Sequence, residues 1–324
     1  MEIVCVTGAG GYVASWVVKE VLAKGYFVHG TVRDLDDEKK NGHLKKLKHA
    51  EEKLHLFKAD MLDYASLCTA MDRCTGVVHV ASPVPAGKVA DPQAEMFEPV
   101  ITGTRNVMNA CLNTKVNKVV IVSSLLAIVA NPSWPKNQVM DENCWTDVEF
   151  CMKNEKWYCA AKTISEREAL EFGKKNNIKV VTVCPSLVFG PMLQSTICTT
   201  NLVLLNLFKG ENSFNLLELN AQDDIDIPIV DVRDCANALL LAYEKAEADG
   251  RYLCSSHTLK KKALTELLNS LFPHYIYPTN CYRASDEKLN YTCEKLVNLG
   301  WNHMSLEKTL VDSVRTFQKA GLLS

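Results

Sequence analysis

The amino-acid sequence predicts an α/β fold, a doubly wound parallel sheet with a smaller C-terminal lobe. In the first half, short apolar runs alternate with longer helical patterns, which is typical of strands buried on both faces and separated by helices. After residue 185 the alternation becomes irregular, and Pro and Gly residues interrupt it. The length of 324 residues leaves room for a second lobe beside the sheet.

The elements follow in chain order. Mainly apolar runs predict strands at residues 3–7, 27–32, 54–58, 77–80, 118–122 and 179–183. Amphipathic patterns between them predict helices over residues 12–24, 102–113 and 160–176. A strand over 227–232 and a helix over 234–244 resume the pattern. We therefore expect a main domain of residues 1–185, to which 227–245 return, and a substrate-binding lobe of residues 186–226 and 246–324.

The composition excludes several classes of protein. With 47% hydrophobic and 23% charged residues the chain is not disordered, and its net charge of −2 gives no basic surface for nucleic acid. The 13 cysteines are scattered without a Cys-x-x-Cys pair, which predicts buried thiols and no metal site. The N-terminus does not resemble a signal peptide, and the longest apolar stretch is too short for a bilayer. We expect a cytoplasmic protein with no membrane contact.

Glycines are concentrated between the first predicted strand and the first predicted helix. The segment contains Thr7, Gly8, Gly10 and Gly11 and leads into Tyr12. Glycines allow a tight turn and a close approach of the backbone to a pyrophosphate, and the N-terminus of the helix favours that anion. Because strand, turn and helix occur in this order, the sequence predicts a dinucleotide site rather than a purely structural turn.

The second predicted strand ends in a basic residue. A ribose 2′-hydroxyl is usually bound by an acidic residue at this location, whereas Arg33 suits a 2′-phosphate. Lys39 or Lys40 supplies a second cation, although both also fit a solvated helix surface. These residues favour NADPH over NADH.

Tyr158 and Lys162 lie four residues apart, on one face of a predicted helix. A lysine ammonium beside a phenol lowers the pKa of the phenol, as general acid–base chemistry requires. Ser123 and Ser124 end the strand at 118–122, where side chains reach the carboxyl edge of the sheet. Together with the glycine turn, these groups are a strong signal for a general acid–base site beside a bound dinucleotide.

With these motifs the chain resembles the extended short-chain dehydrogenase/reductases, which have a Rossmann fold, and in particular the plant cinnamoyl-CoA reductase and dihydroflavonol reductase group. The similar segments run from end to end of the chain, at residues 6–12, 31–34, 79–83, 122–124, 141–145, 156–159 and 250–256. The resemblance implies Ser124, Tyr158 and Lys162 as catalytic residues. It implies a cofactor-binding set of Thr7, Gly8, Gly10, Gly11, Tyr12, Val13, Arg33, Lys40, Asp60, Met61, Val80, Ala81, Ser82, Ser123, Tyr158, Lys162, Pro185 and Val188.

The chain also departs from that group. Dihydroflavonol reductases carry an asparagine where Val129 stands, which puts flavonoid reduction in doubt. The histidine and lysine that contact CoA in cinnamoyl-CoA reductases align with Val203 and Asn206, and a later arginine aligns with Lys261. Two of three phosphate-directed groups are therefore missing, which favours a substrate without CoA.

We therefore expect an NADPH-dependent reductase that reversibly converts hydroxycinnamyl aldehydes, which are small aromatic aldehydes, to alcohols. It would be related to cinnamyl alcohol dehydrogenases and act as a monomer or homodimer. The alternative is a cinnamoyl-CoA reductase. A sugar-nucleotide epimerase or dehydratase is disfavoured by Arg33, and a catalytically silent NADPH-binding partner protein is disfavoured by the intact Ser124, Tyr158 and Lys162.

Cys151 and Cys159 have the spacing of a cysteine pair that closes a disulfide in cinnamoyl-CoA reductases, but two buried thiols are the simpler interpretation.

Overall fold

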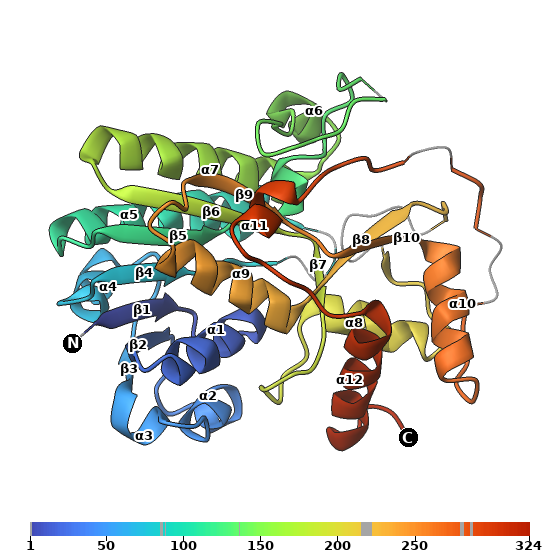
Figure 1. Ribbon diagram of the computed structural model, residues 1–324, viewed down its shortest axis with the longest axis horizontal. Coiled ribbons are helices and arrows are strands. Elements are labelled where there is room, and N and C mark those ends of the chain that lie inside the picture. Colours follow the sequence, from blue (N-terminus) through green and yellow to red (C-terminus); the bar gives the residue numbers. More distant parts are fainter. Residues whose placement is uncertain are drawn as a thin grey trace.

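The main body of the protein is a parallel sheet of seven strands in the order β3-β2-β1-β4-β5-β6-β9 (Figure 1). This computed structural model describes residues 2–84, 87, 89–135, 137–214, 222–278, 282–285 and 288–324. The strands of this sheet are β1 (Ile3–Thr7), β2 (Phe27–Val32), β3 (Leu54–Lys58), β4 (Gly76–His79), β5 (Lys118–Val122), β6 (Lys179–Pro185) and β9 (Gly250–Cys254). The predicted doubly wound sheet is confirmed.

The strand order reverses between β1 and β4. The chain first builds outwards through β2 and β3, then returns to β4 on the other side of β1. The central strands are buried on both faces; every residue of β1 and β4, for example, is buried. A reversal of this kind opens a crevice at the carboxyl ends of the strands, where ligands of open α/β sheets bind.

Helices cover both faces of the sheet. On one face α1 (Tyr12–Ala23) packs against α9 (Val232–Glu244). On the other face α5 (Gly103–Asn113) packs between α4 (Tyr64–Met71) and α7 (Trp157–Asn176). Smaller helices are α2 (Glu38–Lys45), α3 (Ala50–Lys53), α6 (Val148–Lys153) and the 3-10 turn η2 (Leu125–Ala127).

The helix predicted to begin near residue 102 begins earlier. A π-helical stretch, η1 (Gln93–Thr102), runs directly into α5 and contains Pro99. Proline lacks a main-chain N–H, so the regular ladder of an α-helix is interrupted there. The sequence pattern of α5 alone did not indicate this extension.

The smaller lobe lies beside the carboxyl end of the large sheet (Figure 1). A three-stranded sheet in the order β10-β8-β7 forms its centre. Its elements are β7 (Leu187–Phe189), α8 (Thr199–Leu207), β8 (Asp226–Asp231), β10 (His257–Lys260), α10 (Lys261–Leu271) and α12 (Leu306–Lys319), whereas α11 (Glu294–Asn298) packs on β9 of the large sheet. Parts of the two segments predicted for this lobe, 215–221, 279–281 and 286–287, lie outside the described residues.

The structure differs from the predicted path of the chain at two strands. Of residues 227–245, only α9 returns to the large sheet, because β8 pairs with β7 and β10 in the small one. Conversely β9, expected in the smaller lobe, pairs with β6 as the last strand of the large sheet. Both strands are short apolar runs, so their composition does not reveal the sheet to which each belongs.

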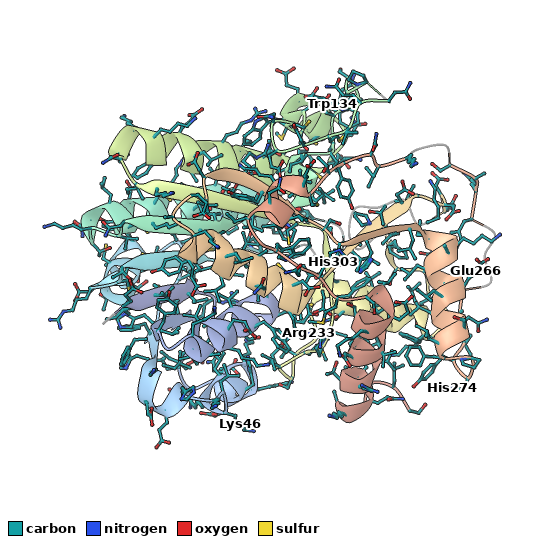
Figure 2. All side chains as sticks on the ribbon, in the orientation of Figure 1. Lys46, Trp134, Arg233, Glu266, His274 and His303 are labelled. Carbon is teal, nitrogen blue, oxygen red and sulfur yellow. The ribbon has the colours of Figure 1, made fainter. Side chains whose placement is uncertain are left out.

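The last helix is attached to the main body by a charged cluster. Arg233, at the start of α9, lies beside α12 (Figure 2), and its guanidinium contacts Asp231 at 2.7 Å and Asp312 at 2.7 Å. Apolar residues of both lobes also form one continuous cluster, which includes Val4 of β1 and Leu310 of α12. The lobes therefore share a core, which fixes the wall of the cavity between them.

Within the described ranges, no helix is long and apolar enough to cross a membrane. Nor do the described side chains bring three potential metal ligands together.

Candidate active site

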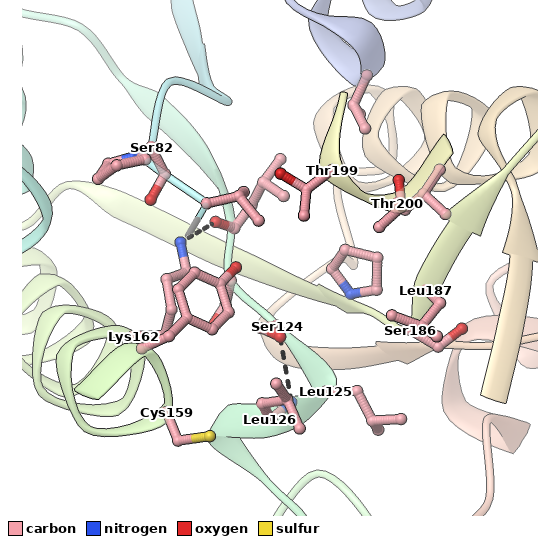
Figure 3. Close-up of a pocket in the computed structure, with 18 of the residues that line it drawn as sticks. Ser82, Ser124, Leu125, Leu126, Cys159, Lys162, Ser186, Leu187, Thr199 and Thr200 are labelled. Atoms are coloured by element: carbon pink, nitrogen blue, oxygen red, sulfur yellow. Dashed lines mark hydrogen bonds between the residues drawn. The ribbon is translucent and has the colours of Figure 1, made fainter. Parts of the chain in front are cut away.

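A cavity of about 1720 Å³ lies at the carboxyl edge of the large sheet, between the sheet and the smaller lobe. Pockets for single drug-sized ligands measure about 300–1,000 Å³, so this cavity has room for two molecules side by side. Every residue predicted for the site lines it except Thr7. Figure 3 shows the part around Ser124 and Lys162, with Ser186 and Thr200 on the opposite wall.

The glycine turn forms one end of the cavity. Gly8 has φ +66°, a left-handed conformation that favours glycine, and a Cβ there would lie 3.0 Å from Ala81. A Cβ on Gly10 would lie 2.9 Å from Lys40 O and from Asn41 Oδ1. Helix α1 begins directly after Gly11, without a side-chain cap and without an acidic residue in its first turn. Its N–H groups are therefore available to an anion.

Thr7 lies behind this turn rather than in the cavity. Its side chain is fully buried, and Oγ1 accepts hydrogen bonds from the N–H groups of Val80 and Ala81, both at 3.1 Å. His79 contacts the same oxygen at 2.8 Å and Thr104 at 3.4 Å. His79 is thus a hydrogen-bonded core residue, and its burial lowers its pKa to about 3. Thr7 therefore positions the turn instead of touching a ligand.

The basic residues predicted for a 2′-phosphate lie at the end of β2. Arg33 and Lys40 are exposed and line the cavity, and Lys40 also lies 3.1 Å from Asp37. The segment between them is held by Asn41, a buried side chain that donates to Asp34 O at 2.6 Å. Sequence reasoning missed Asn41, because an asparagine within a polar stretch carries no signal of its own.

The remaining predicted cofactor residues line successive parts of the same cavity. Asp60 and Met61 follow β3, Val80 to Ser82 follow β4, and Pro185 and Val188 flank the end of β6. Ser82 Oγ is buried and has no partner within the described part of the chain. A buried hydroxyl without a partner is costly, so Ser82 offers a hydrogen bond to a ligand.

Ser124, Tyr158 and Lys162 all line this cavity and come from two elements. Ser124 caps the turn η2, and its Oγ accepts from Leu126 N at 3.2 Å (Figure 3). Tyr158 and Lys162 come from the first two turns of α7. Because the Ser124 oxygen accepts that bond, its O–H remains able to donate into the cavity.

The environment of Lys162 is nearly closed to water. Its side chain is buried, and Nζ donates to Val122 O at 2.7 Å, the contact drawn in Figure 3. Burial lowers the pKa of Lys162 to about 8, while Glu166 and Cys184 act in the opposite direction. An ammonium with one main-chain partner has two further N–H groups to offer. It can therefore serve both Tyr158 and a ligand hydroxyl.

The far part of the cavity is lined by both lobes. Trp134 and Met140 come from the segment before α6, and Asn290 comes from the C-terminal lobe. Met140 N donates to Asn290 O at 2.8 Å, and Thr292 N donates to Met140 O at 3.0 Å. These two bonds form a main-chain bridge across the rim of the cavity.

The residues aligned with CoA-contacting groups do not line the cavity. Val203 is fully buried in the core of the smaller lobe, and Asn206 donates to Ser213 at 3.2 Å. Lys261 is also buried, with its ammonium 5.2 Å from the centre of the Phe214 ring. The side chain at position 203 points into packed apolar residues, so these positions no longer argue against a CoA substrate. On α8, the cavity is lined by the first turn, including Thr199 and Thr200.

Cys151 and Cys159 are buried thiols in the structure and pack into one small apolar cluster.

Comparison with known proteins identifies the family. A model of the NAD dependent epimerase/dehydratase family matches residues 4–255. Cinnamoyl-CoA reductase 1 of Petunia hybrida is 40% identical over 325 residues, covering 99% of this chain and 94% of that protein. Tetraketide alpha-pyrone reductase 1 of Arabidopsis thaliana is 36% identical, covering 99% and 97%. The crystal structure of vestitone reductase from alfalfa matches with a TM-score of 0.82 at 27% identity and covers 100% of both chains. The chain therefore belongs to the NAD dependent epimerase/dehydratase family, the extended short-chain dehydrogenase/reductases.

Proposed function

We propose that the protein is an NADPH-dependent reductase of hydroxycinnamoyl compounds, and that its substrate is the CoA thioester, which it reduces to the aldehyde. The observation that carries the proposal is the meeting of Ser124, Tyr158 and Lys162 in one cavity with the glycine turn. The thioester is favoured because the similar proteins include cinnamoyl-CoA reductases at 40% identity over nearly the whole chain.

The residues around the glycine turn fit a dinucleotide. Gly8 and Gly10 leave a cradle that a Cβ would fill, and the N-terminus of α1 favours the pyrophosphate. Arg33 and Lys40 suit a 2′-phosphate, while Asp60 and Met61 would flank the adenine. When bound, NADPH supplies the hydride that reduces the carbonyl carbon.

Replacement of Arg33 by Ser is expected to change the cofactor preference. Charge-assisted hydrogen bonds to a phosphate contribute about 1.5–3 kcal/mol, so NADPH affinity should fall by roughly 10–100-fold while NADH affinity stays the same. Titration of each cofactor, followed by protein fluorescence, measures both. Lys39→Ser is the control, because Lys39 does not line the cavity. An equal loss for both cofactors would remove Arg33 from the phosphate site.

The chain's own contribution is to place proton donors where negative charge develops. As hydride reaches the carbonyl carbon, Tyr158 donates its proton to the carbonyl oxygen and Ser124 donates a hydrogen bond to it. The Lys162 ammonium, one helical turn from Tyr158, stabilises the phenolate that remains after the proton is transferred, and it orients the nicotinamide ribose. With the thioester, the C–S bond then breaks and CoA leaves as the thiol, so that one NADPH and one proton are consumed for each aldehyde and free CoA formed.

Reduction of the free aldehyde to the alcohol is the second candidate. The part of the cavity lined by the C-terminal lobe contains Asp223 and Asp226 beside the single lysine Lys288, among the residues that are described. Asp226 is paired with Lys260 at 3.4 Å, so among the described residues this part of the cavity offers a CoA phosphate little positive charge, which favours an uncharged substrate such as coniferaldehyde.

The test is the loss of NADPH absorbance with purified protein and either feruloyl-CoA or coniferaldehyde at matched concentrations. Preference for feruloyl-CoA, with release of free thiol, is the expected result. Turnover of coniferaldehyde alone would establish the second candidate. If neither is reduced, the proposal of a hydroxycinnamoyl substrate is wrong.

A further inference from the structure

A buried carboxylate lies directly behind the candidate catalytic groups. Glu166 follows Lys162 by one turn of α7, and it is only 1% exposed. Its Oε2 accepts from Ser123 Oγ at 2.7 Å, and its Oε1 accepts from Thr182 Oγ1 at 2.5 Å. An ionised carboxylate is stable at such a site only when it is paired and fully hydrogen-bonded.

Arg251 supplies the opposite charge from β9. Its Nε lies 2.9 Å from Glu166 Oε1 and its Nη2 lies 3.2 Å from Oε2, a two-pronged contact. The guanidinium also lies 3.5 Å from the centre of the Trp145 ring. The other hydrogen bonds of the guanidinium go to the main-chain oxygens of Ala127, Glu142 and Cys144.

These contacts hold the chain on both sides of Ser124. The preceding residue, Ser123, is bonded to Glu166, and Ala127, in the turn that Ser124 caps, is bonded to Arg251 at 3.2 Å. A shift of either charged group would therefore move the turn that carries the Ser124 hydroxyl. A displacement of about 1 Å at a reacting group can cost about 10²-fold in rate.

The same carboxylate is the negative charge nearest to Lys162 in the interior. Three groups interact electrostatically with Lys162. They are Glu166 on its own helix, Cys184 on β6 and His79 on β4. Burial raises the pKa of Cys184 well above its ordinary value and lowers that of His79 to about 3, so neither is charged near neutral pH.

The other elements packed on α7 bring no further charge to this interior. Arg105 of α5 bonds the half-buried Glu168 at 2.6 Å, and α6 contributes the buried thiol of Cys151. Glu95 and Glu98 of η1 are exposed.

We propose that Glu166 and Arg251 form a positioning pair, which fixes the turn that carries Ser124 and holds the Glu166 carboxylate one helical turn from Lys162. The inference rests on the proposed function, since it concerns how the same site is held in its active form. Neither residue touches the cavity, so both act through Ser124 and Lys162.

Glu166→Gln tests the pair, because it removes the charge at constant size. We expect kcat to fall by about 10²-fold. At alkaline pH, kcat should decrease as Lys162 loses its proton; we call this decrease the alkaline fall. In the variant we expect it at a pH about one unit lower, since Lys162 loses its proton more readily without the carboxylate. Glu168→Gln makes the same change on the exposed side of α7 and should alter neither. Glu166→Asp keeps the charge and should lower kcat without moving the alkaline fall.

A second measurement needs no substrate. Lys162 is expected to bond the nicotinamide ribose, so NADPH affinity should weaken as Lys162 loses its proton. In Glu166→Gln this weakening should begin at lower pH than in the wild type or in Glu168→Gln. If the wild type reduces neither feruloyl-CoA nor coniferaldehyde, the proposed function fails, and this NADPH profile still decides the inference.

The outcomes are distinct. The inference is overturned if Glu166→Gln behaves as Glu168→Gln does, and also if kcat falls while both pH profiles stay in place, because the pair is then merely structural. Should the Gln variant fail to fold, Glu166→Asp replaces it, and unchanged kcat in that variant overturns the inference.

Discussion

Tyr158→Phe is expected to abolish detectable turnover while NADPH affinity stays close to that of the wild type. The substitution removes the phenolic proton that the carbonyl oxygen needs, and a positioned general acid contributes about 10²–10⁴-fold. The ring itself remains, and it packs beside Phe97 and Trp157 in a small apolar cluster. Stopped-flow measurement of NADPH oxidation, together with a fluorescence titration of NADPH, separates the two effects.

The control is Tyr64→Phe, an equal change at a tyrosine that is 42% exposed on α4. It should leave turnover and affinity unchanged. Retained activity in Tyr158→Phe would show that another group protonates the substrate, and loss of NADPH affinity would show that the phenol belongs to the cofactor site instead.

Arg251→Met should lower the free energy of unfolding by about 3–5 kcal/mol, because it leaves the Glu166 carboxylate buried without its partner. The guanidinium is 5% exposed and also bonds the loop around Cys144, so its loss leaves main-chain oxygens without donors as well. Urea denaturation followed by circular dichroism measures the change.

A second arginine–glutamate pair, whose glutamate also lies on α7, provides the comparison. Arg105 contacts Glu168 at 2.6 Å, but their side chains are 57% and 34% exposed. Exposed pairs contribute about 0–1 kcal/mol, so Arg105→Met should be nearly neutral. In the double variant Glu166→Gln/Arg251→Met, part of the lost stability should return, since no charge is left unpaired in the interior. Equal destabilisation by the two arginine variants would contradict this account of the buried pair.

Features encoded by neighbouring residues were predictable from the sequence. The bounds of β1, β2, β3 and β5 agree with their apolar runs, and the glycine turn lies where strand, turn and helix follow in order. Tyr158 and Lys162 could be paired because helical spacing alone puts them on one face.

Features that depend on distant parts of the chain were not predictable. Glu166 and Arg251 meet across a separation of 85 residues, and neither lies in a motif that marks a buried ion pair. The burial of Val203 in the core, away from the cavity, could not be foreseen for a related reason. Sequence position along α8 does not reveal which face of the helix is turned towards the cavity and which into the core.

The main-chain bridge between Met140 and the segment 290–292 has a consequence for access to the active site. It closes the rim with two hydrogen bonds contributed by strands of chain that are remote in sequence. Each such bond contributes about 0.5–1.5 kcal/mol net, so parting the rim costs about 1–3 kcal/mol, which corresponds to an open state populated at roughly 1–15%. Because both hydrogen bonds involve Met140, they should be lost together when the rim parts. The amide hydrogens of Met140 and Thr292 are therefore expected to exchange with solvent at the same rate, which hydrogen-exchange measurements can check.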